Sequence, residues 1–306
     1  MPSMTRFHCA LVLWTCLSPA LAQDDPYDRA ASRVADDLRG KVARERAVRE
    51  EHATWADPWI VESPHYRVRV AESWILANGL SQGLETMRER FTALIPGRVT
   101  PGGRSAIFVL PTLADYQQFG DDHGDARSSF YGSFYASGHP EKPVATYVDS
   151  NATRQRMTVT HGATLQYLDQ AFPNRSTPAW IDYGLASYFH LQWAYTYGVD
   201  ELNRLEGSGF IPLSNLLAIQ VDGNGASLNA NNAHAHFMEL GMLFNYLLHY
   251  REDTRTDPAA GNAGAFAKYL RAALAGQDVS THPVHQLLFE QTAQLEADLK
   301  AYEFPR

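Results

Sequence analysis

The chain carries a small group of polar side chains whose types and spacing could hold a metal ion or move a proton. Imidazole and carboxylate groups are the usual ligands of zinc and the usual general acids and bases. Six polar residues between positions 161 and 236 lie on stretches that are predicted to be helical or to enter a helix: His161, Gln166, Asp182, His190, His234 and His236. The chemistry to consider first is therefore metal-assisted hydrolysis.

The stretch that begins at His161 has only one of the groups that this chemistry needs. A zinc-hydrolase helix reads His-Glu-x-x-His, in which two imidazoles one turn apart bind the ion and the Glu activates water. His161 keeps the first ligand position, whereas Gly162 stands at the Glu and Leu165 at the second His. On the next predicted helix, Tyr183 stands where a third ligand, a glutamate, would be expected.

The residues around these replacements resemble the secreted, peptidase-MA-like gluzincins of bacteria, a family of domains of unknown function. Their core reads near His-Glu-Ala-Thr-His-Gln, followed by Pro-Pro-Trp-Leu-x-Glu-Gly-Leu-Ala-Glu-Tyr-Phe. This chain keeps the frame of both motifs: Ala163, Thr164 and Gln166, then Pro178, Trp180, Gly184, Leu185, Ala186, Tyr188 and Phe189. The same order of elements extends over residues 64–304. The resemblance implies a zincin-like fold with a cleft between the sheet edge and a helical half.

The replacements are compatible with one another in a site that has lost its metal. Without a cation, a buried glutamate at position 183 would be an unpaired charge, which costs several kcal/mol. A tyrosine is neutral and fills the space, and Leu165 fills the volume of a liganding ring. We therefore expect no catalytic residue, no metal and no other cofactor. Tyr183 is expected to lie beside His161.

The alternative is an active hydrolase or metallopeptidase with relocated ligands. Asp182 precedes Tyr183 by one residue, which turns its side chain about 100° around a helix. His190 shares the face of Tyr183 but lies about 10 Å along the axis, which is too far for one ion. His234 and His236 cannot face one another on a helix, although a loop could bring either to His161. Gln166, Asp182, His234 and His236 are the candidate cleft residues.

The N-terminal residues have the pattern of a secretory signal peptide. Arg6 precedes an apolar stretch, and Ala20-Leu21-Ala22 forms a small-x-small cleavage site, so we assign residues 1–22 to the signal. Both cysteines, Cys9 and Cys16, lie in this segment. The mature chain would then contain neither a disulfide nor a cysteine nucleophile, and we expect export to the periplasm or beyond.

The charge balance restricts the expected partners. The chain has 34 acidic and 26 basic residues, with a net charge of −8. A dispersed acidic balance argues against nucleic acid or an anionic membrane surface as partner. No segment after residue 22 is apolar enough to span a membrane. A peptide or an envelope protein is the expected partner, whereas the sequence leaves its identity and the oligomeric state open.

Periodicity predicts an α+β fold in which a small mixed sheet packs on the helix that bears His161. A charged helix or arm is expected over 23–57, then a domain over 58–306 with a sheet-containing half (58–171) and a helical half (172–306). Strands are predicted at 65–70, 106–110, 130–136 and 144–148. Helices are predicted at 74–94, 112–119, 154–171, 178–196, 233–251, 262–275 and 292–303.

Overall fold

The computed structural model describes Gly40 and residues 54–97, 103–123, 132–197, 211–219, 233–255 and 264–302. The chain divides into two compact units, residues 1–48 and 49–306, and the second is described below. The predicted signal peptide lies outside the described residues, as does almost all of the charged helix or arm.

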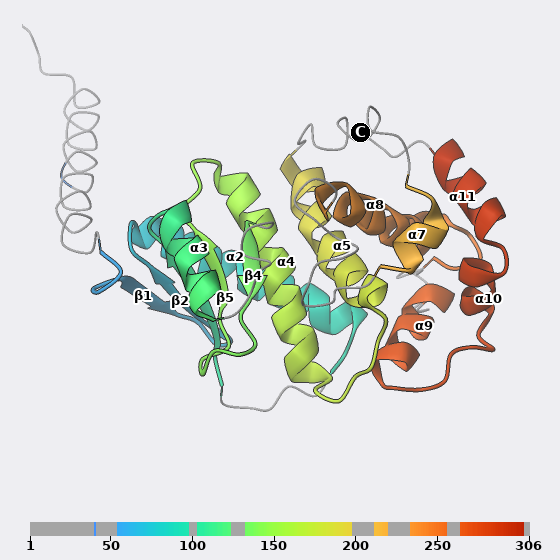
Figure 1. The fold of residues 1–306 in the computed structure, drawn as a ribbon, viewed down its shortest axis with the longest axis horizontal. Helices are drawn as coiled ribbons and strands as arrows, with labels where there is room; N and C mark the ends of the chain where they lie inside the picture. The colour runs from blue at the N-terminus through green and yellow to red at the C-terminus, as the bar shows by residue number, and fades with distance from the viewer. Residues whose placement is uncertain are drawn as a thin grey trace, which may run out of the picture. The chain divides into compact units, whose positions relative to one another are not determined.

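The second unit begins with the strands and ends with a series of helices, as Figure 1 shows. In chain order the elements are β1 (Trp59–Glu62), β2 (Tyr66–Val70), α2 (Trp74–Leu94), β3 (Ser105–Leu110), α3 (Leu113–Asp122), β4 (Ser133–Tyr135), β5 (Val144–Tyr147), α4 (Ala152–Ala171), α5 (Ala179–Tyr197), α7 (Leu213–Leu217), α8 (Ala233–Asn245), the π-helical turn η2 (Tyr246–Tyr250), α9 (Ala265–Leu274), α10 (Pro283–Phe289) and α11 (Thr292–Ala301).

The five strands form one mixed sheet in the order β1-β2-β3-β5-β4. The central pairs β2–β3 and β3–β5 are parallel, whereas the outer pairs β1–β2 and β5–β4 are antiparallel. The predicted α+β class and mixed sheet are therefore confirmed. Strand β4 lies at the edge of the sheet. Among the strands that the structure describes, it pairs with β5 alone.

Helices cover both faces of the sheet. Side chains on a strand alternate between its two faces, so the apolar residues of a central strand pack against helices on both sides. Ile107 and Val109 of β3 face α2 and α4 and belong to one buried cluster with Val159 and Ala163. Phe108 of β3 packs on the other side, with its ring centroid 5.9 Å from that of Phe119 on α3. All six residues of β3 are buried, as expected of a central strand covered on both faces.

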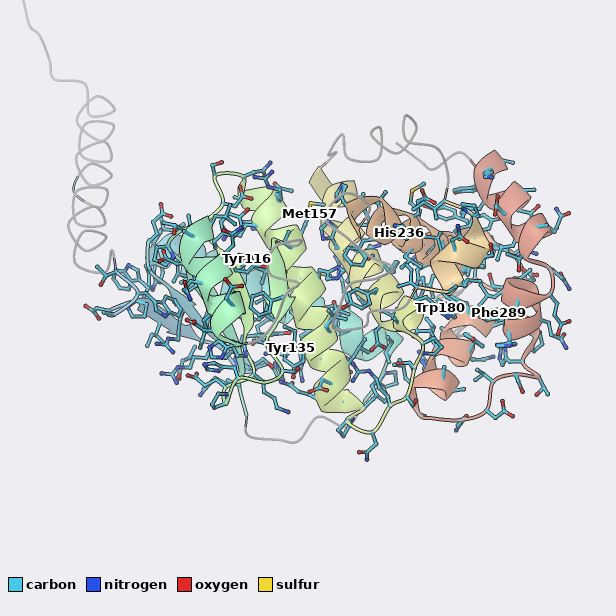
Figure 2. The ribbon with its side chains drawn as sticks, viewed as in Figure 1. Tyr116, Tyr135, Met157, Trp180, His236 and Phe289 are labelled. Atoms are coloured by element: carbon cyan, nitrogen blue, oxygen red, sulfur yellow. The ribbon has the colours of Figure 1, made fainter. Side chains whose placement is uncertain are left out.

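A second and larger core fills the helical half. It joins one side of α4 and the C-terminal part of α2 to α5 and the later helices. Trp180, labelled in Figure 2, is completely buried near the start of α5 and contacts the rings of Phe244, Tyr269 and Phe289. Tyr188 and Phe189 are also buried, so these aromatic residues of the motif are core residues.

Three short elements were not predicted from the sequence: β1, α7 and α10. Contacts with distant segments hold α7 in place. Glu239 of α8 accepts a hydrogen bond from the Ile211 amide at 2.8 Å, and Glu296 of α11 accepts one from the Leu213 amide at 2.9 Å. The predicted helix 233–251 is instead α8 followed by a π-helical turn. None of the helices described has the length and apolar character needed to cross a membrane.

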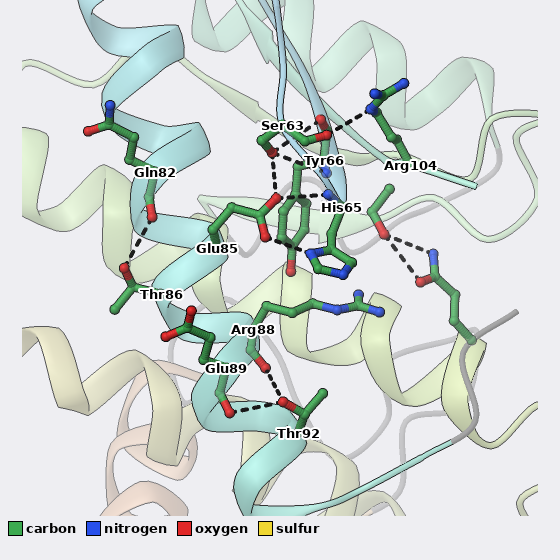
Figure 3. A network of polar contacts seen from close by, with 12 residues as sticks. Ser63, His65, Tyr66, Gln82, Glu85, Thr86, Arg88, Glu89, Thr92 and Arg104 are labelled. Atoms are coloured by element: carbon green, nitrogen blue, oxygen red, sulfur yellow. Dashed lines mark hydrogen bonds and ion pairs between the residues drawn. The ribbon is translucent and has the colours of Figure 1, made fainter. Parts of the chain in front are cut away.

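A polar network attaches α2 to the turn between β1 and β2, as Figure 3 shows. The Glu85 carboxylate accepts hydrogen bonds from the Ser63 hydroxyl at 2.6 Å, the His65 amide at 2.8 Å and the His65 Nδ1 at 2.7 Å. Burial alone would raise the pKa of the Glu85 carboxyl, but the hydrogen bonds from Ser63 and His65 lower it below 4.5. The ionised form of Glu85 therefore stabilises this corner of the fold.

Replacing Glu85 should destabilise the protein in a pH-dependent manner. We expect Glu85→Ala to lower the free energy of unfolding by about 1–3 kcal/mol at pH 7, because three donors lose their acceptor. Since the folded-state pKa is below 4.5, this contribution is present above pH 4.5 and disappears as the pH falls through the folded-state value. Urea denaturation at pH 7 and at acidic pH measures both effects. Glu89→Ala, at an exposed position of α2, is the matched control.

Candidate functional site

The candidate site lies where α4, α5 and α8 pack side by side, next to the edge strand β4 (Figure 1). Helix α4 contacts β4 and β5 with one face and α5 with another, and α5 in turn packs against α8. Gly184 of the second motif permits the close approach of α5 and α8, because a Cβ at this position would overlap the ring of Phe244. The second motif helix is therefore held against α8 by packing that the motif spacing alone does not reveal.

His161 lies in a group of rings contributed by α5 and α8. Its ring centroid is 6.0 Å from that of Tyr183 and 4.9 Å from that of Phe237. Tyr183 and Phe237 stack on each other with centroids 5.1 Å apart and an interplanar angle of 2°. The expected proximity of His161 and Tyr183 is confirmed. The contact of both with Phe237 was not predicted.

His190 also lies beside His161, a contact that its separation from Tyr183 along the helix did not predict. The centroids of the two imidazoles are 6.1 Å apart, nearly the same distance as from His161 to Tyr183. Tyr183 and His190 lie on the same helix and are separated along its axis. His161 is on a different helix, so its ring can contact two α5 residues that are two turns apart.

The structure gives a packing reason for glycine at position 162 that the sequence did not reveal. A Cβ at this position would lie 2.5 Å from Cγ1 of Val144 on β5 and 3.4 Å from Oγ of Ser133 on β4. Gly162 therefore faces the sheet and allows α4 to approach it closely. The interpretation of Gly162 solely as the loss of a catalytic glutamate is incomplete, because the structure offers no room for such a side chain without movement of β5.

The other expected site residues are divided between structural and cleft positions. Leu165 packs against both hydrophobic cores. Gln166 donates from Nε2 to the carbonyls of Ala106 and Lys142 and so ties α4 to the sheet. Asp182 accepts hydrogen bonds from Arg175 and Thr177 in the loop between α4 and α5. Gln166 and Asp182 were expected in the cleft. In the structure Gln166 instead binds the sheet and Asp182 binds the loop before α5.

A cavity of about 100 Å³ adjoins His161. Its lining comes from the edge of β4, from α4, from α5 and from the start of α8: Gly132, Ser133, Thr158, His161, Ser187, His190, His234, Phe237 and Met238. His234 thus reaches the cavity from within α8, whereas His236, labelled in Figure 2, is not part of this lining. Ser187 was not predicted as a cleft residue, although its i, i+3 spacing from His190 on α5 places the two on one face.

A second cavity of about 190 Å³ continues from the first. The two share Gly132, Thr158, His190 and His234 in their walls. The second cavity adds the Asp149–Arg154 ion pair, in which the guanidinium donates to both carboxylate oxygens at 2.5 and 2.8 Å. Together the cavities form a cleft beside β4.

The imidazoles of His161 and His190 are held in their neutral form. Burial, followed by the neighbouring His190, lowers the pKa of His161 from 6.5 to about 3. Burial and the nearby His234 lower the pKa of His190 to about 4. A hydrogen bond to the Met157 main chain raises this pKa, but its effect is smaller. The main-chain group that favours a protonated imidazole is a carbonyl oxygen, so one ring nitrogen of His190 donates to Met157 and the other is an acceptor.

The residues present do not fit the zinc site that the resemblance implies. Gly162, Leu165 and Tyr183 replace its other chemical groups, and the part of the chain that the structure describes contains no group of three His, Cys, Asp or Glu side chains placed to hold a metal ion. Comparison of the chain with protein-family models, with curated proteins and with solved structures gave no match. The zincin-like fold and the relationship to peptidase-MA-like proteins remain predictions from the residues.

Substitution of Gly162 should test the contact between α4 and the sheet. We expect Gly162→Ala to destabilise the protein by about 1–3 kcal/mol, because the new methyl group overlaps a β-branched side chain. Gly79→Ala on α2 is the matched control, since its Cβ would be 3.8 Å from the nearest neighbour, Nη2 of Arg156. It should stabilise the protein by about 0.5–1 kcal/mol. Thermal and urea unfolding measure both, and stabilisation by Gly162→Ala would contradict the contact.

The His161 and His190 imidazoles should make the protein sensitive to acid. Their folded-state pKa values lie below the ordinary 6.5, so the unfolded chain binds more protons and stability falls as the pH drops below 6.5. Each group contributes a slope of up to about 1.4 kcal/mol per pH unit. We expect His161→Phe and His190→Phe each to reduce this slope between pH 6.5 and 5 in urea titrations. An unchanged slope in both variants would show that these rings are not kept neutral by folding.

Proposed function

We propose that this chain is an exported, non-catalytic, metallopeptidase-like protein that binds an extended peptide segment, such as part of an envelope protein, in the cleft beside β4. The observation that carries the proposal is the ring group around His161. The one imidazole retained from the zinc-hydrolase pattern packs against the rings of Tyr183 and Phe237, and among the described residues no group of three possible metal ligands includes it.

The position of the cleft supports a peptide as the ligand. β4 is an edge strand of the sheet, and the cavity lining begins with Gly132 and Ser133 at this edge. An extended segment can add to such an edge through main-chain hydrogen bonds while its alternate side chains enter adjacent pockets. The walls opposite β4 come from α5 and α8, so a bound segment would lie between the sheet and the helical half.

A test uses the whole mature chain and blocked pentapeptides of the form Ac-Ala-Ala-Xaa-Ala-Ala-NH2. We expect peptides to bind without being cleaved and to slow amide hydrogen exchange at residues 132–136. Exchange at β1, the opposite edge of the sheet, should not change and is the internal control. Calorimetry, mass spectrometry of the recovered peptide and hydrogen exchange provide the three measurements. Absence of binding, or protection of β1 instead, would contradict the proposal.

A metallopeptidase with relocated ligands is the second candidate, because His161, His190 and His234 line the same cavity. It predicts stoichiometric zinc that survives desalting and is lost in His161→Phe, together with cleavage of the pentapeptides. The non-catalytic proposal predicts substoichiometric zinc and intact peptides. Elemental analysis and mass spectrometry distinguish the two.

A further inference from the structure

The cavity beside His161 has a lining that is partly polar. Among its lining residues there is neither a carboxylate nor a lysine nor an arginine. The nearby Asp149 carboxylate is already paired with Arg154 through both of its oxygens. A charged ligand group would therefore lose its hydration without gaining a counter-charge. The lining favours an uncharged group that forms hydrogen bonds.

Ser187 gives the clearest indication that the cavity is built for such a ligand. Its side chain is only 2% exposed, it lines the cavity, and its Oγ has no hydrogen-bond partner in the fold. A serine within a helix often satisfies its hydroxyl with the carbonyl one turn earlier, but this hydroxyl does not. A buried hydroxyl without a partner destabilises the folded protein, so its place at a cavity wall calls for a functional explanation.

Three other polar side chains of the lining offer acceptors. The Ser133 hydroxyl donates to the Thr158 carbonyl at 2.5 Å, and the Thr158 hydroxyl donates to the Gln155 carbonyl at 3.0 Å. Their oxygen lone pairs remain for a ligand. His190 uses one nitrogen as donor to the Met157 main chain and keeps the other as acceptor. A ligand that complements this lining needs more than one N–H donor and, for the Ser187 hydroxyl, an acceptor.

A carboxamide is the uncharged side-chain group with two N–H donors and a carbonyl acceptor. Its size also suits the cavity. A cavity of about 150 Å³ holds benzene, and the volume beside His161 is about 100 Å³, which suits a group slightly smaller than a benzene ring. Phe237 and Met238 provide apolar surface for the methylene groups that precede the amide.

We propose that this cavity is a specificity pocket for one carboxamide side chain, that of glutamine or asparagine, and that Ser187 supplies the buried hydroxyl that recognises it. The inference rests on the proposed function, because a peptide bound along β4 would present the side chain. It adds the chemical class of the residue that the cleft selects.

The experiment compares pentapeptides Ac-Ala-Ala-Xaa-Ala-Ala-NH2 in which Xaa is Gln, Glu, Lys or Met. We expect the Gln peptide to bind at least about tenfold more tightly than the other three, because each of these leaves polar groups of the pocket without a complement. Met is the closest comparison, since it is unbranched and similar in length but has no amide. Equal binding of all four peptides would overturn the inference while leaving peptide binding intact.

Ser187→Ala separates recognition from a structural role. We expect this variant to lose most of the preference for Gln over Met, while its Tm stays the same or rises by a few degrees, because no hydrogen bond of the fold is lost. Thr164→Val is the matched control. It removes another buried hydroxyl of the motif helices, one that donates to the Thr160 carbonyl at 2.9 Å, so it should lower the Tm and leave the preference unchanged. An unchanged preference in Ser187→Ala would overturn the role of Ser187.

A small probe distinguishes failure of the pocket from failure of the proposed function. Propionamide should give saturation-transfer signals with the full chain, propionate should not, and the propionamide signals should weaken in Ser187→Ala. If propionamide binds in this way and no pentapeptide does, the pocket stands and peptide binding fails. If propionamide and propionate behave alike, the pocket assignment is wrong.

Discussion

The close contact between α4 and the sheet is the constraint on which the rest of the structure depends. Gly162 brings the helix against Val144, and the amide of Gln166 fixes the helix to two carbonyl groups of the sheet half. A rotation of α4 by one residue would turn every side chain by about 100°. His161 would then leave the cavity, and Leu165 would leave the boundary between the two cores.

This fixed helix places His161 among aromatic rings, where it loses part of its hydration. Aromatic rings from α5 and α8 enclose the imidazole, and the loss of hydration keeps it neutral. Neutral imidazoles and hydroxyl groups can bind a ligand by hydrogen bonds without a counter-charge. The residues at the positions of the expected zinc site are thus integrated into the packing of the helices and the sheet.

The proposed carboxamide pocket assigns a purpose to a feature that is unfavourable for stability. Folded proteins satisfy nearly all of their buried polar groups, and exceptions concentrate at functional sites. Ser187 is such an exception in a helix that is otherwise well packed. Its neighbour one turn later, His190, has one nitrogen engaged with the Met157 main chain, which orients the ring. The fold therefore orients the His190 ring, whereas the Ser187 hydroxyl has no partner in the fold and is the group that we propose binds the ligand.

The sequence by itself determined the long elements and the fold class, because periodicity over many residues is a local property. It located β2, β3, α2, α4 and α5, and motif spacing correctly brought His161 next to Tyr183. Tertiary structure alone decided the short elements β1, α7 and α10, which have too few residues for a periodic signal and depend on distant partners such as Glu239 and Glu296. It also decided that His190 reaches His161 and that Gly162 faces Val144, since both depend on how a helix crosses its neighbours in space.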